Sequence, residues 1–264
     1  MPNPIRQLPP ALVNRIAAGE VIERPASVVK ELLENSLDAG ATSITIDIED
    51  GGRALIRITD DGSGIPAAEL PLAFASHATS KIIDDADLFS ISTMGFRGEA
   101  LASIGSVSFA KMTSRTRESN EAYEIQNRGG SIGDVQACAA PVGTSVEVRD
   151  LFFNVPARRK FLKGSGTETG HIADAVLRVA LVRPEVSFKL ISGGRTNLDL
   201  PASDPITRWL EAWPADYAQQ KLSIDVREAE LKLIGIIGKP ELAQPHAKNQ
   251  YVYVNGRFVR DKSI

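Results

Sequence analysis

Glu31 and Asn35 are the residues whose types and spacing say most about chemistry. They lie four positions apart in a segment, residues 27–39, whose apolar side chains recur with the period of an α-helix. Positions i and i+4 of a helix share one face, so this carboxylate and this amide can address a single ligand. Gly40 follows as a suitable left-handed cap. The opposite stripe, which would pack on a sheet, consists of Val28, Val29, Leu32, Ser36 and Leu37.

A second carboxylate, Asp60, ends a predicted strand, residues 55–60, in the frame Asp60-x-Gly62-x-Gly64. Side chains alternate along a strand, so the pattern that buries its two isoleucines also turns Asp60 inward. A half-buried carboxylate needs a hydrogen-bond donor, and the exocyclic amine of adenine is one candidate. Such a bond contributes about 1.5 to 3 kcal/mol, or about ten- to a hundredfold in affinity. The two glycines would let a flat ring approach the backbone, so an ATP site is predicted.

The phosphates of such a nucleotide would need donors from elsewhere in the chain. A polar stretch, residues 76–81, leads to a predicted lid in which Gly95 and Gly98 precede a helix beginning near Glu99. Free backbone N–H groups at that helix start, together with its positive dipole end, would suit triphosphate oxygens. Further along, Thr144 lies at the start of a predicted strand, and its hydroxyl could reach the base directly or through water.

The elements that must position these residues alternate between helix and strand. A hairpin is predicted from residues 44–49 to 55–60, and a later helix covers residues 168–182. Proline and polar residues near position 203 break both periodicities and predict a domain boundary there. We therefore expect a first domain at residues 1–203 and an incomplete second domain at 204–264. The other predicted strands are 186–191, which turns at Gly193-Gly194, then 222–226, 231–237 and 251–255.

Composition narrows the classes of protein that fit. The chain has 264 residues, 43% hydrophobic and 24% charged, and its net charge of −3 leaves room only for a local basic patch. It shows no long apolar run and no leader, so we expect a soluble, cytoplasmic protein with no membrane contact. One cysteine, Cys138, cannot form an internal disulfide, and three scattered histidines give no zinc spacing. These counts argue against a transition-metal mechanism.

Each signal also has an ordinary explanation. Glu31 and Asn35 alone could be a solvated helix face, and the glycines after Asp60 could be a simple turn. Residues 62–67 also imitate a dinucleotide fingerprint, but that motif needs a parallel β-α-β unit, whereas this strand follows a tight hairpin. The basic run after Pro156 is usually solvated, although DNA contact remains open. The ATP interpretation depends on all of these motifs occurring together and in this order.

Taken together, the motifs resemble those of the GHKL ATPases and, within that superfamily, those of the MutL family. The resemblance is carried by residues 14–22, by the helix with Glu31 and Asn35, by residues 95–101, and by residues 154–162. It implies an α+β fold in which helices cover a mixed, mostly antiparallel sheet, the Bergerat ATP-binding sandwich. A partial ribosomal-protein-like α/β domain would follow.

The resemblance also implies roles for individual residues. Glu31 would position and deprotonate the water that attacks the γ-phosphate, Asn35 would supply one protein oxygen to Mg²⁺, and Asp60 would hold adenine. Residues of the pocket or its lid would be Gly64, Thr79, Gly95, Phe96, Gly98 and Thr144. The DNA-contact candidates are Arg158, Arg159 and Lys160.

The implied function is a slow, nucleotide-driven switch in DNA mismatch repair. ATP would order the lid and residues 1–24 and so join two copies in a homodimer. That dimer would connect a MutS-type mismatch sensor to a downstream nuclease or helicase, with weak, salt-dependent DNA binding at the nucleoid. One alternative is a nucleotide-gated DNA clamp that does not hydrolyse ATP, and another is a histidine-kinase ATP domain.

Two departures from the family pattern bear on these expectations. Asp61 stands where the family commonly has asparagine, which places a second carboxylate beside Asp60. The family also completes its active site with a lysine from the second domain, in a region that we expect this sequence to lack. We therefore expect ATP hydrolysis by this chain alone to be weak or absent.

Overall fold

The computed structural model describes residues 18–19, 21–76, 78–79, 98–213, 215–245 and 249–260. The chain divides into two compact units. The first consists of Met1–Val176 with Phe188–Asp199, and the second of Leu177–Ser187 with Leu200–Ile264. The division proposed from the sequence, between residues 203 and 204, lies close to Leu200, but residues 177–187 also belong to the second unit.

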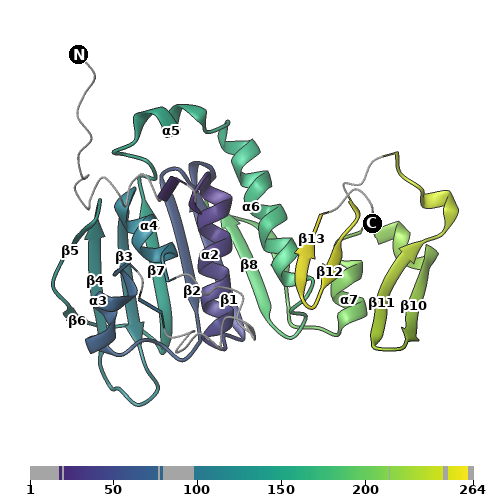
Figure 1. Cartoon of the computed structure of the whole chain (residues 1–264), viewed down its shortest axis with the longest axis horizontal. Helices are drawn as coiled ribbons and strands as arrows, with labels where there is room; N and C mark the ends of the chain where they lie inside the picture. Colours follow the sequence, from purple (N-terminus) through teal and green to yellow (C-terminus); the bar gives the residue numbers. More distant parts are fainter. Residues whose placement is uncertain are drawn as a thin grey trace. The chain divides into compact units, whose positions relative to one another are not determined.

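A single large sheet forms the centre of the first unit (Figure 1). Within the described residues it has nine strands in the order β5-β4-β3-β7-β2-β1-β8-β9, and β6 pairs with β4. The pairs β1–β2, β2–β7, β3–β7 and β3–β4 are antiparallel. The predicted α+β class is therefore confirmed. The strands are β1 (Ser43–Glu49), β2 (Leu55–Asp60), β3 (Phe109–Arg115), β4 (Ala122–Arg128), β5 (Ser131–Ile132), β6 (Gln136–Cys138), β7 (Gly143–Arg149), β8 (Ser187–Ser192) and β9 (Arg195–Leu200).

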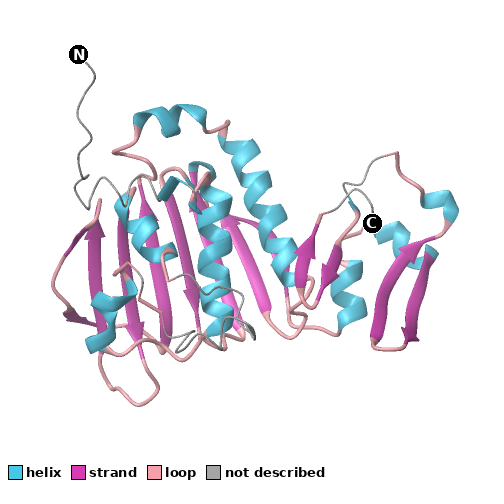
Figure 2. Ribbon diagram, in the orientation of Figure 1, coloured by secondary structure: helices cyan, strands magenta, loops and turns pink. Residues whose placement is uncertain are grey.

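Helices α2 (Pro25–Asp38) and α4 (Ala100–Ser106) lie on one face of this sheet (Figure 2). Helix α2 confirms the predicted amphipathic helix and begins two residues earlier, because Pro25 fits the first turn, where a backbone N–H has no partner to lose. Gly40 ends it with a positive φ of 72°, as predicted. The predicted stripe, together with Leu33, is buried against the sheet. Shorter helices in this unit are η1 (Asp50–Gly52), η2 (Ala67–Glu69), α3 (Leu70–Ala73) and α5 (Pro156–Phe161).

Three further predictions of secondary structure hold with small shifts. The hairpin of β1 and β2 turns through Asp50, Gly51 and Gly52, all with positive φ, and β8 and β9 turn at the predicted glycine pair. Helix α6 (Ser165–Ala180) begins three residues before the predicted start. The reason is Glu168, which is buried in the first turn and accepts a hydrogen bond from the Lys163 backbone N–H at 2.9 Å.

The second unit contains the three strands predicted after residue 204 and one more. The extra strand is β13, which pairs with β12 across a turn in which Asn255 and Gly256 have φ of 50° and 76°. Its elements are α7 (Pro205–Leu210), η4 (Ala215–Gln220), β10 (Lys221–Glu228), β11 (Leu231–Gly238), η5 (Pro240–Leu242), β12 (Val252–Val254) and β13 (Arg257–Val259).

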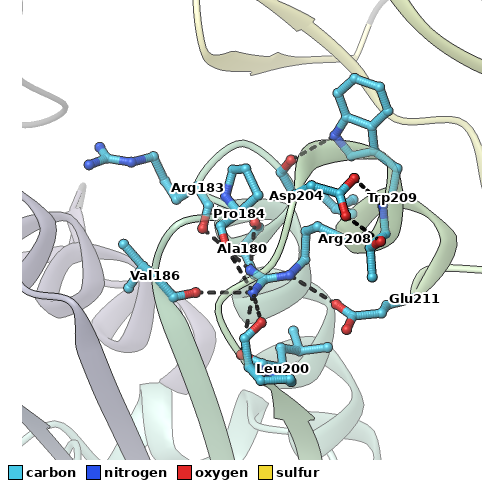
Figure 3. Close-up of polar contacts among 12 residues, drawn as sticks. Ala180, Arg183, Pro184, Val186, Leu200, Asp204, Arg208, Trp209 and Glu211 are labelled. Atoms are coloured by element: carbon cyan, nitrogen blue, oxygen red, sulfur yellow. Dashed lines mark hydrogen bonds and ion pairs between the residues drawn. The ribbon is translucent and has the colours of Figure 1, made fainter.

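A buried arginine organises the second unit (Figure 3). Arg208 of α7 is 0% exposed, and its guanidinium donates hydrogen bonds to backbone carbonyls from two separate stretches of chain, residues 180–186 and 200–201. Glu211 Oε2 lies 2.9 Å from Nε, which neutralises the charge although the alignment is not that of a hydrogen bond. The accepting residues are Ala180, Arg183, Pro184, Val186, Leu200 and Pro201. One side chain thus satisfies a set of buried carbonyls at the C-terminal end of α6 and around it.

Among the described helices, none carries a run long and apolar enough to cross a lipid bilayer.

Candidate functional site

Asp60 lies at the end of β2 with its carboxylate almost fully hydrogen-bonded. Oδ2 accepts from the Ser36 hydroxyl at 2.7 Å, and Oδ1 accepts from the backbone N–H groups of Gly62 and Thr144 at 3.0 and 3.2 Å. Burial raises the pKa of Asp60, and the three donors work against that rise. All three partners donate, so they favour the ionised carboxylate. A carboxylate has about four acceptor positions, so about one is left for a ligand.

Helix α2, which carries the predicted base Glu31 and the predicted Mg²⁺ ligand Asn35, contacts this strand end through Ser36. Ser36, whose hydroxyl reaches Asp60, immediately follows Asn35, and Glu31 lies one turn earlier on the same helix. The Glu31 side chain is 25% exposed, and its closest described ion-pair partner is Lys30 at 3.4 Å, a long contact that leaves the carboxylate available. Lys30 makes its shorter ion pair, 2.9 Å, with Glu34. Sequence reasoning placed Ser36 only in the packing stripe and missed its contact with Asp60.

Two glycines allow backbones to meet beside Asp60. Gly64 has a φ of 73°, and a Cβ there would collide with the backbone carbonyl of Arg115 at the end of β3. Gly143 has a φ of 115°, and a Cβ there would collide with the carbonyl of Asp60 itself. Sequence reasoning named Gly64 as a pocket residue but gave Gly143 no role in the pocket. Each position needs glycine both for its conformation and for its space.

Gly64→Ala is expected to destabilise the first unit by about 2 to 5 kcal/mol, the sum of left-handed strain and overpacking. Gly40→Ala is the matched control, because Gly40 has nearly the same φ, 72°, with nothing within 4 Å of its Cβ position. Strain alone predicts a loss of about 1 to 2 kcal/mol there. Urea denaturation of both variants measures the difference, and equal losses would show that the contact with Arg115 is not tight.

Thr144 joins the same cluster through a buried serine. The Ser114 hydroxyl lies 2.9 Å from the Thr144 hydroxyl, 3.0 Å from the Gly143 carbonyl and 2.8 Å from the backbone N–H of Ile65. Ser114 is 1% exposed and so connects β3, β7 and the loop after β2 out of contact with water. Nothing in the local sequence distinguishes this serine from a surface one, and the sequence analysis did not identify it.

Asp61, which departs from the family pattern, makes its hydrogen bonds to the start of β1 and not to the neighbours of Asp60. Its carboxylate accepts hydrogen bonds from the Thr42 backbone N–H and hydroxyl and from the Ser43 backbone N–H, at 2.7, 2.6 and 2.8 Å. Burial would raise its pKa, but these bonds lower the pKa below the ordinary value. The second carboxylate therefore caps the start of β1 and does not compete with Asp60 for a ligand.

The predicted lid is described only at its two ends. Thr79 lies on one side and Gly98 on the other, and a Cβ at Gly98, whose φ is 59°, would meet the carbonyl of Ala78 at 2.5 Å. The two described ends of the predicted lid, residues 78–79 and residue 98, are therefore in contact. Gly95 and Phe96 lie outside the described residues. Helix α4 begins at Ala100 with Glu99 at its cap, as predicted.

The three predicted DNA-contact residues of α5 do not share one environment. The Arg158 guanidinium packs against Gly19 and lies 5.8 Å from the centre of the Phe152 ring, so it faces the protein. Arg159 and Lys160 are exposed, and Phe161 beside them is 81% exposed. Only Arg159 and Lys160 have the exposure that contact with a large ligand requires.

A cavity of about 320 Å³ lies on the other face of the sheet, away from Asp60. Its charged residues are largely paired with one another: Glu147 contacts Arg57 and Arg149 at 2.7 Å each, and Lys111 contacts Glu124 at 2.8 Å. We therefore regard it as part of a solvated sheet face. The cavity is lined by Phe109, Ala110, Lys111, Gln126, Arg128, Glu147 and Arg149.

Helices on one face of a largely antiparallel sheet, with a buried aspartate at a central strand end, define an ATPase fold of the GHKL class. Residues 22–131 match the profile of the "Histidine kinase-, DNA gyrase B-, and HSP90-like ATPase" family, and residues 211–264 match that of "DNA mismatch repair protein, C-terminal domain". The two profiles fall mainly in the first and second unit, respectively.

Whole-chain comparisons identify the family within that class. The DNA mismatch repair protein MutL of Anaeromyxobacter sp. (strain K) is 48% identical over 260 residues, and that of Azotobacter vinelandii is 52% identical over 269. These matches cover 98% and 100% of this chain but 43% and 42% of the relatives. The "Aquifex aeolicus MutL ATPase domain complexed with ADP" has a TM-score of 0.69 at 36% identity, over 92% of this chain and 85% of that one. The chain belongs to the MutL family of DNA mismatch repair proteins.

Proposed function

We propose that this chain binds ATP at Asp60 and serves as the slow, nucleotide-driven switch of a mismatch repair protein. The observation that carries the proposal is the Asp60 carboxylate, which accepts hydrogen bonds from three donors and has about one acceptor position left. The exocyclic amine of adenine is a donor of the required kind. The similar Aquifex aeolicus domain, which was solved with ADP, supports this choice of ligand.

The reaction itself would divide between Glu31 and Asn35. The Glu31 carboxylate would orient the attacking water and take its proton, because phosphoryl transfer to water requires mainly an oriented nucleophile and neutralised phosphate oxygens. The residues also fit Mg²⁺, since the Asn35 amide offers one oxygen on the same helix as Glu31. The described residues contain no cluster of three or more His, Cys, Asp or Glu side chains that could hold a metal ion. When bound, Mg²⁺ would neutralise phosphate oxygens.

Lid residues and partners complete the proposal. Gly64, Thr79, Gly98 and Thr144, with Gly95 and Phe96, would surround the nucleotide, and its binding would join two copies of the chain. Arg159 and Lys160 would contact DNA weakly and in a salt-dependent way, because exposed cations bind phosphates mainly by releasing counterions. A mismatch sensor and a downstream nuclease or helicase in the cytoplasm would be the partners of the full-length protein.

The test is isothermal titration with a nonhydrolysable ATP analogue and Mg²⁺. Asp60→Asn is expected to weaken binding by about ten- to a hundredfold, because the amide replaces a charged acceptor. Binding to the parent should also weaken as pH falls through the raised pKa of Asp60, since protonation removes the acceptor that adenine needs. Asp61→Asn is the control and should bind normally. Equal affinities in the parent and Asp60→Asn would refute the adenine assignment.

A further inference from the structure

The hydroxyl of Ser114 has three neighbours, and one arrangement of protons satisfies all three contacts. A serine hydroxyl has one proton to donate and two lone pairs that accept. The Gly143 carbonyl, at 3.0 Å, can only accept, so it takes the Ser114 proton. The Ile65 backbone N–H, at 2.8 Å, can only donate, so it occupies one lone pair. The Thr144 hydroxyl, at 2.9 Å, must then donate to the other.

This arrangement decides which bonds Thr144 can offer to a ligand. Its single hydroxyl proton is committed to Ser114, so only oxygen lone pairs remain for the pocket. Its backbone N–H is also committed, because it donates to Asp60 at 3.2 Å. Ser114 is 1% exposed, so water does not compete for its bonds, and breaking one would leave a buried group without a partner.

Asp60 beside it also offers only an acceptor, since Ser36, Gly62 and Thr144 all donate to its carboxylate. Two neighbouring groups that only accept form a surface that favours a base edge carrying hydrogen-bond donors. The 6-amino group of adenine carries two such hydrogens, whereas a 6-oxo purine such as guanine or hypoxanthine presents an acceptor at that position. An acceptor brought against two acceptors leaves buried groups unpaired, which gives strong discrimination.

We propose that Ser114 is the positioning residue that makes this site selective for a 6-amino purine, because it holds the Thr144 hydroxyl as an acceptor beside Asp60. The proposal rests on the proposed ATP binding at Asp60 and adds the origin of its selectivity. Ser114 acts through Thr144 and does not need to touch the base.

The experiment measures the affinities of the β,γ-imido analogues of ATP and ITP with Mg²⁺, whose bases carry a 6-amino group with an unprotonated N1 and a 6-oxo group with a protonated N1, respectively. The parent should prefer the ATP analogue by about a hundredfold or more. In Ser114→Ala the Thr144 hydroxyl is free to turn and donate a hydrogen bond to the 6-oxo group. The preference should therefore fall by about tenfold or more, because an unfavourable contact between two acceptors becomes a hydrogen bond. Ser114→Thr keeps the hydroxyl and should restore the preference.

Ser108→Ala is the matched control. Ser108 is also buried, lies directly before β3, and donates to the Ile104 carbonyl at 2.6 Å, so its loss removes a similar bond elsewhere. It should leave the ratio of affinities unchanged. If Ser114→Ala does not fold, Thr144→Val and Thr144→Ser make the same comparison, and only the valine variant should lose the preference.

The possible outcomes separate this inference from the proposed function. A parent that binds neither analogue contradicts the proposed function. A parent that binds both equally, a preference that survives in a folded Ser114→Ala or, if that variant does not fold, in Thr144→Val, or an equal loss in Ser108→Ala overturns the role of Ser114 while ATP binding stands.

Discussion

Replacing Arg208 with methionine is expected to lower the free energy of unfolding of the second unit by about 3 to 5 kcal/mol. Methionine is of similar length, so the main loss is chemical: backbone carbonyls that accept from the guanidinium at 2.6 to 3.4 Å would be left buried without donors. Those carbonyls belong to the main chain and cannot be removed with the arginine. Urea denaturation followed by tryptophan fluorescence measures the loss, because Trp209 is the next residue and donates to the Leu181 carbonyl.

Two further substitutions test the reason for that loss. Arg208→Lys keeps the charge but not the planar fork, so it should lose most of the same stability. Arg227→Met removes an exposed arginine of β10 and should change stability by less than about 0.5 kcal/mol. If Arg208→Lys were as stable as the parent, charge alone would explain the stabilisation. The hydrogen bonds from the guanidinium to the backbone carbonyls would then not be the cause of the loss.

Glu31→Gln is expected to reduce Mg²⁺-dependent phosphate release by about a hundred- to ten-thousandfold while leaving nucleotide affinity nearly unchanged. The amide keeps the size of the side chain but cannot take a proton from water. The chain spans 43% of a curated relative's length, so the assay uses the full-length protein. Phosphate release under saturating ATP measures the rate, and titration with the imido analogue measures binding.

Glu34→Gln is the control on the same helix. Glu34 is bound to Lys30 at 2.9 Å, and its change should alter the rate only slightly. A full-length protein that binds ATP but releases no phosphate would instead favour the nucleotide-gated clamp, the alternative that the sequence leaves open. Equal losses in both variants would contradict the role of Glu31 as base.

The sequence predicted those parts of the fold and site that repeat with a period or depend on a local turn. Helix α2, the hairpin of β1 and β2, and the inward carboxylate of Asp60 follow from spacing alone, because burial of the apolar residues fixes which way each neighbour points. The order β3-β7-β2 brings together segments far apart in the chain, and no local pattern reveals that order.

The residues that sequence reasoning missed all make contacts with residues that are distant in the sequence. Ser36 and Ser114 are ordinary serines until the fold places an acceptor within reach of each. Arg208 contradicts the usual tendency of arginine to remain in water, and only the carbonyls of other segments explain its burial. Arg158 was grouped with its basic neighbours, but contact with Gly19 and Phe152 distinguishes it from them.

Pairing of β2 with β7 has a consequence for how the domain assembles. Asp60 and Thr144 touch although 84 positions separate them, so neither half of the pocket exists until the centre of the sheet has closed. Closing so long a loop is slow, and partly folded molecules would present no place for the nucleotide. Ligand would then bind the native state alone and raise the melting temperature in proportion to the logarithm of its concentration. Under the proposed function, ATP would in that way also protect newly made copies from proteolysis.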